Sequence, residues 1–206
     1  RNIAKRFGAL TALSNVDLEI RSGEVLALLG DNGAGKSTFI KILAGAHAPS
    51  EGELIIEGNP VAFHSPKDAA SSGIATIFQE LALSENLSIA ENVFLGRELK
   101  RSIFGIPFLK RKEMRQRVDD LLQELDAHIS DPEAPVGSLS GGQRQAVAIC
   151  RALNLNARLV IMDEPTAALA VAETRKVLAL TRRLAARGCA VVLISHNISE
   201  VFEVAD

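Results

Sequence analysis

Eight residues near the N-terminus have the composition of a phosphate-binding loop. Residues 30–37 fit the pattern G-x-x-x-x-G-K-[ST], between an apolar run typical of a buried strand and a stretch of helical period. Glycines let backbone N–H groups converge on phosphate oxygens, a helix start adds its positive dipole end, a lysine reaches the terminal phosphates and a serine hydroxyl suits Mg²⁺. We predict triphosphate binding by Gly30, Asp31, Asn32, Gly33, Ala34, Gly35, Lys36, Ser37 and Thr38.

Two adjacent carboxylates follow another apolar run, at residues 159–162. Asp163 and Glu164 are expected at the carboxyl edge of the sheet, where doubly wound folds bind ligands. Asp163 suits Mg²⁺ binding, and Glu164 suits proton transfer from the water that attacks the γ-phosphate. His196 follows a further apolar run, so we expect its ring to face the same edge and to sense the γ-phosphate. The alternative for the two acids, solvated carboxylates at a strand end, is uncommon beside a phosphate loop.

Apolar runs alternate with helical stretches through much of the chain. This order predicts an α/β fold with a mostly parallel, doubly wound sheet. The alternating run 16–20 predicts an edge strand, and the wholly apolar run 25–29 predicts a central one. Further strands are expected at 74–78, 159–162 and 190–194, and helices at 36–43, 66–73 and 172–187.

The middle of the chain, residues 83–156, is mostly helical in pattern. Ser88 and Glu91 form a capping-box pattern, and residues 111–125 are amphipathic. The apolar run 103–109 is interpreted as packing within this lobe, with contact to a membrane partner as the alternative. We predict one domain over residues 1–206, with a core of 1–82 and 157–206 and an inserted helical subdomain of 83–156.

Composition narrows the function classes. The 206 residues carry a net charge of -2, so we expect no nucleic acid partner, and no apolar run approaches the roughly 20 residues that a membrane helix needs. Cys150 and Cys189 lie in apolar segments and are interpreted as reduced core residues, with a disulfide as the alternative. The chain begins without Met and stops within a helical pattern, which indicates trimming at both ends.

The stretch LSGGQRQ, residues 139–145, resembles the signature motif of ABC ATPases and precedes the acidic run as in that family. The phosphate loop alone does not separate kinases, GTPases and motors, whereas this motif does. The resemblance covers nearly the whole chain and implies the ABC ATPase fold, with a small antiparallel β part near the N-terminus. It also implies roles for three residues: Gln79 in the Q-loop and beside Mg²⁺ with Ser37 and Asp163, His196 as the switch histidine, and Phe7 as an adenine platform. Phe7 has the alternative of a core residue.

The signature stretch predicts a second anion site. Ser140 opens a helix, and the glycines after it leave backbone N–H groups bare. This site cannot fold back onto the first loop, so it needs a second ATPase domain. By resemblance, two copies pack head to tail, as a homodimer or a tandem pair, and the ATP of one copy contacts Ser140, Gly141, Gly142 and Gln143 of the other.

Residues 65–75, 78–81 and 90–97 resemble the ATPases of bacterial monosaccharide importers of the ribose, xylose and fructose type. The resemblance implies an ATP-hydrolysing subunit on the cytoplasmic face of the membrane. It would energise sugar uptake through a separate permease served by a periplasmic or extracellular sugar-binding protein. Many ABC ATPases carry Asp where this chain has Ala170. The difference predicts altered communication between the two ATPase domains through the loop that contains this residue.

Two alternatives to transport follow from the same motifs. A soluble ABC ATPase that acts on ribosomes or DNA is disfavoured because the insert is short and no strongly basic arm is present. A regulatory module that does not hydrolyse ATP is disfavoured because the residues for hydrolysis are all present: Lys36, Gln79, Ser140, Asp163, Glu164 and His196.

Overall fold

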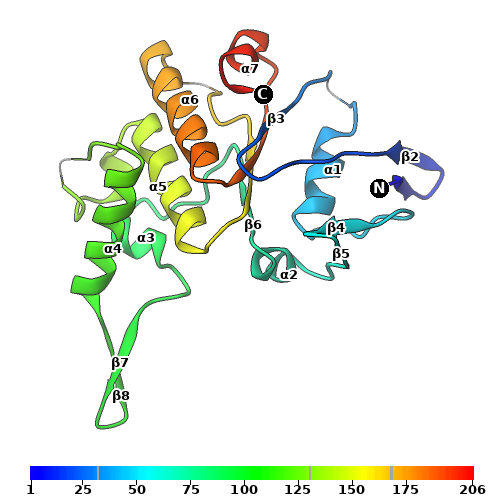
Figure 1. Cartoon of the computed structure of the whole chain (residues 1–206). Helices are drawn as coiled ribbons and strands as arrows, with labels where there is room; N and C mark the ends of the chain where they lie inside the picture. The colour runs from blue at the N-terminus through cyan, green and yellow to red at the C-terminus, as the bar shows by residue number, and fades with distance from the viewer. Residues whose placement is uncertain (32, 130, 168) are drawn as a thin grey trace.

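A four-stranded parallel sheet forms the centre of the molecule (Figure 1). The computed structural model describes residues 1–31, 33–129, 131–167 and 169–206, so the predicted loop residue Asn32 lies outside the described residues. Strands 25–29, 74–78, 159–162 and 190–194 are confirmed to within a residue or so. In spatial order they are β3 (Val25–Leu28), β10 (Ala190–Ile194), β9 (Leu159–Asp163) and β6 (Ile74–Ile77).

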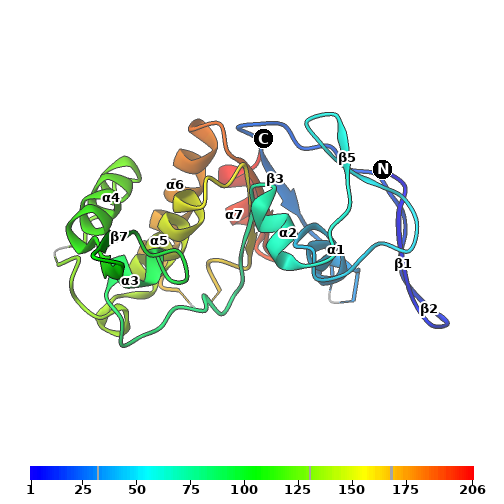
Figure 2. The ribbon, with the colours of Figure 1, turned by 90° about the horizontal axis from the view of Figure 1, so that it is seen from below.

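Helices cover both faces of this sheet, as predicted. Side chains alternate along a strand, so β10 gives Val191 and Leu193 to one core and Val192 and Ile194 to the other. The first core includes residues of α5 and α6, and the second includes residues of α1 and α2 (Figure 2). The bounds are α1 Lys36–Leu43, α2 Pro66–Ser71, α5 Gly141–Asn154 and α6 Val171–Ala186; α7, Ile198–Val204, follows β10.

Two strand predictions were wrong. The strand β3, expected to be central, lies at an edge of the four-stranded sheet, and three of its four residues are only half-buried. The predicted strand at 16–20 is not formed: β2 (Leu10–Val16) ends at its first residue and pairs antiparallel with β1 (Ile3–Phe7). Beyond Val16 the Asp17 carboxylate accepts the Asn2 backbone N–H at 2.8 Å, so a side chain replaces the ladder there. A second antiparallel ribbon joins β4 (Leu54–Ile56) to β5 (Asn59–Val61).

The middle of the chain forms a helical lobe beside the sheet, with α3 (Ile89–Val93), α4 (Arg111–Glu124) and α5. The predicted capping box is present: the Ser88 hydroxyl accepts the Glu91 N–H at 3.2 Å, and the Glu91 carboxylate accepts the Ser88 N–H at 3.0 Å. A short 3-10 helix, Val136–Ser138, leads into α5. The assignment of residues 83–156 as a separate inserted subdomain stays a prediction.

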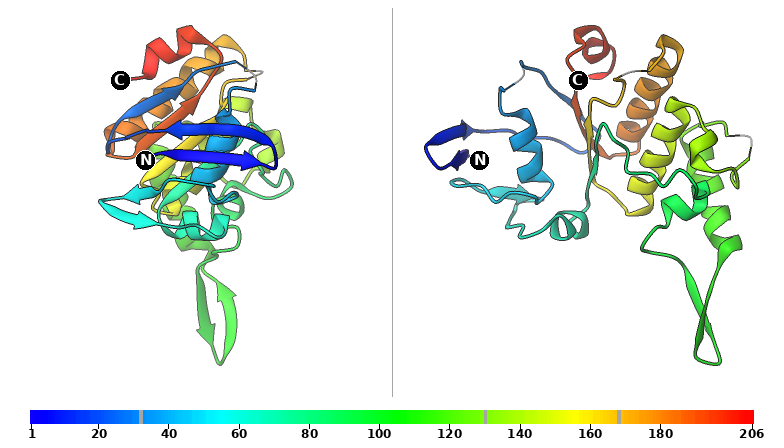
Figure 3. Two further views of the ribbon diagram at one scale, coloured as in Figure 1. Left: turned by 90° about the vertical axis from the view of Figure 1, so that its right-hand side faces the viewer. Right: turned by 180° about the vertical axis from the view of Figure 1, so that it is seen from behind.

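An unpredicted hairpin projects from this lobe (Figure 3). Strands β7 (Lys100–Ile103) and β8 (Ile106–Leu109) pair with each other, and Phe104 and Gly105 turn the chain with φ of 50° and 82°. Phe104 is fully exposed, and Ile106 and Phe108 are also exposed. The interpretation of 103–109 as packing within the lobe is therefore wrong, because a tight two-residue turn carries the apolar side chains outward. Contact with a membrane partner stays a prediction.

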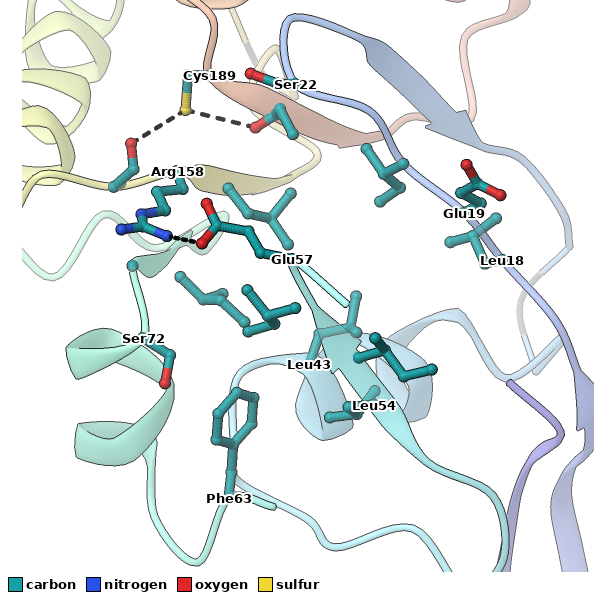
Figure 4. Close-up of a pocket in the computed structure, with 18 of the residues that line it drawn as sticks. Leu18, Glu19, Ser22, Leu43, Leu54, Glu57, Phe63, Ser72, Arg158 and Cys189 are labelled. Atoms are coloured by element: carbon teal, nitrogen blue, oxygen red, sulfur yellow. Dashed lines mark hydrogen bonds and ion pairs between the residues drawn. The ribbon is translucent and has the colours of Figure 1, made fainter. Parts of the chain in front are cut away.

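A cavity of about 1220 Å³ lies at the amino ends of the parallel strands, between the sheet and the antiparallel ribbons (Figure 4). An ion pair of 2.6 Å between Arg158 and Glu57 lies at this cavity. None of the predicted site residues in the described part of the chain lines it. This cavity is therefore remote from the predicted chemistry, which belongs to the opposite end of the strands.

Both cysteines are free thiols inside the core, as predicted. Burial raises the pKa of Cys150 to about 12 and the pKa of Cys189 to about 11. Neither thiol therefore ionises near neutral pH. No helix in the described ranges is long and apolar enough to cross a membrane.

Candidate nucleotide site

The phosphate loop leaves the end of β3 and runs into α1, as predicted. Its lysine, Lys36, donates hydrogen bonds to the carbonyls of Gly30 and Asp31, the latter at 3.0 Å. Gly35 has a φ of +90°, and an added Cβ there would lie 2.7 Å from both the Ala12 carbonyl oxygen and the Leu13 side chain. The start of α1 therefore packs directly against β2, so closely that a side chain at position 35 would clash with it.

The two acids stand at the carboxyl end of β9. The Glu164 N–H donates to the Ile194 carbonyl at 3.0 Å, which ties the ends of β9 and β10 together. Partial burial, and then the nearby Glu164 charge, raise the pKa of Asp163, whereas the Lys36 charge acts to lower it. The charge of the phosphate loop thus acts directly on the first acid. Sequence-distant motifs meet at one edge, as predicted.

The predicted base and switch residue are in contact. The Nδ1 atom of His196 lies 3.2 Å from Oε1 of Glu164. The side chain of His196 is 73% exposed and that of Glu164 is 30% exposed, so water reaches both. A carboxylate oriented by an imidazole and open to water is an arrangement suited to general base catalysis.

Several polar side chains behind this edge were not singled out from the sequence. Gln145 is buried and donates to the Pro165 carbonyl at 2.6 Å, so α5 is tied to the loop that follows Glu164. Thr166 and Ser195 are also buried, and both hydroxyls donate to the Glu200 carboxylate. In the sequence, Thr166 lies two residues after Glu164, Ser195 directly precedes His196, and Gln145 ends the signature stretch, and these positions were the available signal.

The signature stretch forms the tip of α5. The Ser140 hydroxyl accepts the Gln143 N–H at 3.4 Å, and the Gln143 side chain accepts the Ser140 N–H at 3.0 Å. The predicted helix start is therefore confirmed. Hydrogen bonds from the Ser140 hydroxyl and then from the Gly142 N–H lower the pKa of Glu173, in the first turn of α6. This tip attracts negative charge already within its own chain.

The described contacts of Gln79 and Phe7 do not test their predicted roles in magnesium binding and adenine stacking. Gln79 is exposed after β6 and lines a cavity of about 330 Å³ together with Gly141 and Leu169. The structure brings it beside the signature helix, and no described contact joins it to Lys36 or Asp163. Phe7 is 44% exposed and meets His47 edge to face, with ring centres 5.5 Å apart. Their parts in the site stay predictions.

The residues at the edge fit a magnesium ion that is held partly by phosphate and water. No group of three or more His, Cys, Asp or Glu in the described ranges could hold a metal by itself. Mg²⁺ prefers one or two protein oxygens together with substrate phosphates and water. The adjacent charges of Asp163 and Glu164 repel, and a divalent cation would relieve that repulsion. The donor set Ser37, Gln79 and Asp163 is thus chemically suited to the ion.

A phosphate loop, an acidic strand end with a histidine and a glycine-rich helix tip that begins at the exposed Ser140 define a P-loop nucleotide-binding protein. The family model described as "ABC transporter" matches residues 13–167. The chain belongs to this family and is an ABC-type ATPase.

Curated relatives cover the whole chain. It is 52% identical over 206 residues to a xylose/arabinose import ATP-binding protein of Sulfolobus acidocaldarius and 50% identical over 210 residues to a fructose import ATP-binding protein of Rhizobium meliloti. The chain spans 80% and 81% of these proteins. It is 47% identical to a ribose import ATP-binding protein of Yersinia pestis, but spans only 40% of it.

Solved structures confirm the fold prediction. A nucleotide-free ATP-binding cassette from an ABC transporter superimposes with a TM-score of 0.84 at 28% identity, over 100% of this chain and 83% of that one. A dimeric bacterial ABC transporter cassette gives a TM-score of 0.77 at 28% identity, over 99% and 90%. A dimeric cassette in a post-hydrolysis state with ADP and Pi gives 0.76 at 29% identity. The ribosome or DNA alternative finds no support among these relatives.

Proposed function

We propose that this chain is the motor subunit of an importer of monosaccharides. The observation that carries the proposal is the identity of about one residue in two to import ATP-binding proteins for xylose or arabinose, fructose and ribose. The geometry supports the hydrolytic half of the proposal, because Lys36, Asp163, Glu164 and His196 gather at one edge of the sheet.

In the proposed mechanism Lys36 and the backbone N–H groups of its loop bind the β- and γ-phosphates of ATP. Ser37, Asp163 and Gln79 would hold Mg²⁺, which would neutralise charge on the phosphates when bound. Glu164 takes the proton of the attacking water, while the imidazolium form of His196 donates one N–H to that carboxylate, which it holds in place, and the other toward the γ-phosphate. Phe7 stacks on the adenine.

Two such domains close on ATP in the proposed cycle. The tip formed by Ser140, Gly141, Gly142 and Gln143 then contacts the γ-phosphate bound by the partner domain. Dimeric solved cassettes support this arrangement. Closure and opening would drive a separate permease, supplied by an external sugar-binding protein, with this subunit bound peripherally at the cytoplasmic face of the membrane. The exposed hairpin β7–β8 is one surface available to such a partner.

Replacement of Glu164 by Gln in the full-length protein, reconstituted with its permease in lipid vesicles, tests the proposal. The isosteric amide cannot accept the proton, so we expect ATP turnover and sugar uptake to fall together by roughly 10²–10⁴-fold. ATP binding should persist and ATP-bound dimers should accumulate. A matched control is Glu19→Gln, whose side chain is 83% exposed and far from the edge residues in the fold.

Two results would contradict parts of this proposal. Normal turnover by the Glu164→Gln variant would remove the assignment of the base. The second result would be that wild-type vesicles hydrolyse ATP at the normal, Glu164-dependent rate without accumulating xylose, arabinose, fructose or ribose. That result would support the ATPase assignment and contradict the proposed class of transported sugar.

A further inference from the structure

Glu200, in the first turn of α7, has an unusual set of partners for a half-buried carboxylate. Its Oε2 accepts the Thr166 hydroxyl at 2.5 Å and the Ser195 hydroxyl at 3.1 Å. Its Oε1 accepts the side-chain amide of Asn197 at 3.0 Å. Three side-chain donors therefore converge on one charged acceptor. Hydrogen bonds to an ionised group are the stronger kind.

These donors belong to two different loops. Thr166 lies two residues after Glu164, at the end of β9, whereas Ser195 and Asn197 flank His196 at the end of β10. The Ser195 hydroxyl also accepts the Asn197 N–H at 3.0 Å, so the His196 turn is bonded on both sides of the histidine. The Glu200 carboxylate thus joins the loop of the base to the loop of the histidine.

The element that carries Glu200 is itself anchored. Val201 and Val204 of α7 are buried in the core, and the Asn197 side chain caps the helix by accepting the Ser199 N–H at 3.1 Å. A backbone bond from Glu164 to Ile194 also links the two strand ends, but it leaves the side chains beyond it free to rotate. The Glu200 contacts reach past the strands into both loops, where they support the direct contact between His196 and Glu164.

We propose that Glu200 is a positioning residue that holds the Glu164 loop and the His196 loop in register for hydrolysis. The proposal rests on the function proposed above, because it assumes that Glu164 and His196 act on the attacking water. Glu200 itself touches neither ATP nor water in this role. It acts by keeping the 3.2 Å contact between the imidazole and the catalytic carboxylate.

The test compares three variants of the full-length subunit assembled with its permease. In Glu200→Gln the amide either meets the Asn197 amide donor to donor or turns its NH2 group toward the Thr166 and Ser195 hydroxyls, which then have to accept instead of donate. We expect kcat to fall by roughly 10–100-fold, as for a displaced catalytic geometry, with KM for MgATP changed by less than about threefold. Adding Asn197→Asp to Glu200→Gln restores a donor–acceptor pair and retains a good helix cap, so it should recover most of kcat. Glu203→Gln, on an exposed residue of the same helix, should leave kcat unchanged.

The outcomes separate this proposal from the proposed function. If Glu164→Gln abolishes turnover while Glu200→Gln keeps the normal kcat, the positioning role is wrong and the hydrolytic assignment stands. If Glu164→Gln keeps normal turnover, the proposed function fails first. If Glu200→Gln loses thermal stability and ATP binding in proportion, with kcat per bound ATP unchanged, Glu200 is merely structural. Should that variant fail to fold, Ser195→Ala removes a single donor, and an unchanged kcat there would equally overturn the proposal.

Discussion

The nucleotide edge, formed by the Lys36 loop, Asp163, Glu164 and His196, and the signature tip, formed by residues 140–143, are built in opposite ways. The edge brings together residues from the ends of three strands, β3, β9 and β10, and depends on the order of the sheet. The cap of the tip is local, since its capping box joins residues three apart, and the Gln143 amide adds one longer-range hydrogen bond of 3.3 Å to the His128 carbonyl. The nucleotide edge is therefore assembled from three strand ends, whereas the signature tip is one helix start with few long-range contacts.

This difference predicts how substitutions in each region affect folding and catalysis. A change at the nucleotide edge alters contacts between distant segments, so folding and chemistry should suffer together. A change of the exposed Ser140 side chain at the signature tip should affect folding less and appear mainly when the second domain closes on ATP. Substitutions at matched positions can break or sharpen this contrast.

The largest effect is expected for Gly35→Ala at the edge. Both Gly35 and Gly33 have a φ of +90°, but an added Cβ meets β2 at 2.7 Å only at Gly35 and meets nothing within 4 Å at Gly33. The added clash predicts a loss of about 2–5 kcal/mol at Gly35, against about 1–2 kcal/mol of backbone strain at Gly33. Chemical denaturation of the two variants measures both values. Equal losses would show that the seating on β2 is not what requires glycine.

A smaller, stabilising effect is expected beside the tip, for Ala170→Ser. Ala170 starts α6 with φ −66° and ψ 153°, close to the φ −65° and ψ 163° of Ser140, but provides no side-chain cap. Serine there can accept the Glu173 N–H as Ser140 accepts that of Gln143, which should add about 1 kcal/mol to stability. Ala172→Ser, two residues inside the helix, serves as the control. A gain there as large as that at position 170 would rule out capping as the cause.

Most features built from contiguous residues could be predicted from the sequence, whereas several built from distant segments could not. The capping box of Ser88, the helix start at Ser140, the phosphate loop and the strand ending in Asp163 are short, contiguous patterns, and all were found. The network on Glu200 was missed because its members are single common polar residues whose meeting depends on the order of strands. The edge position of β3 was missed because an apolar run does not report how many neighbours a strand has. The hairpin β7–β8 was missed because apolar residues in a turn resemble core residues in sequence.

The smallest expected effect concerns Asp163, the acid nearest the Lys36 loop. Burial first, and then the charge of Glu164, raise its pKa in the folded protein, so the unfolded chain ionises it at lower pH than the folded protein does. Ionisation therefore destabilises the fold as pH rises from the ordinary value of this carboxyl through the raised one, and the penalty persists at neutral pH. Asp163→Asn removes it, and should stabilise the nucleotide-free protein near pH 7 by less than about 1 kcal/mol, because water screens a partly exposed carboxylate.

The same substitution should have the opposite effect with ligand present. MgATP should raise the melting temperature of the wild type more than that of Asp163→Asn, and chelation of Mg²⁺ by EDTA should abolish that difference. Asp68→Asn is the control of opposite sign, since a hydrogen bond from the His64 N–H lowers the pKa of Asp68 and the charge stabilises the fold above its ordinary pKa. If Asp163→Asn instead loses stability without nucleotide, the ionised Asp163 does not destabilise the fold. Bound Mg²⁺ would then have no repulsion between Asp163 and Glu164 to relieve.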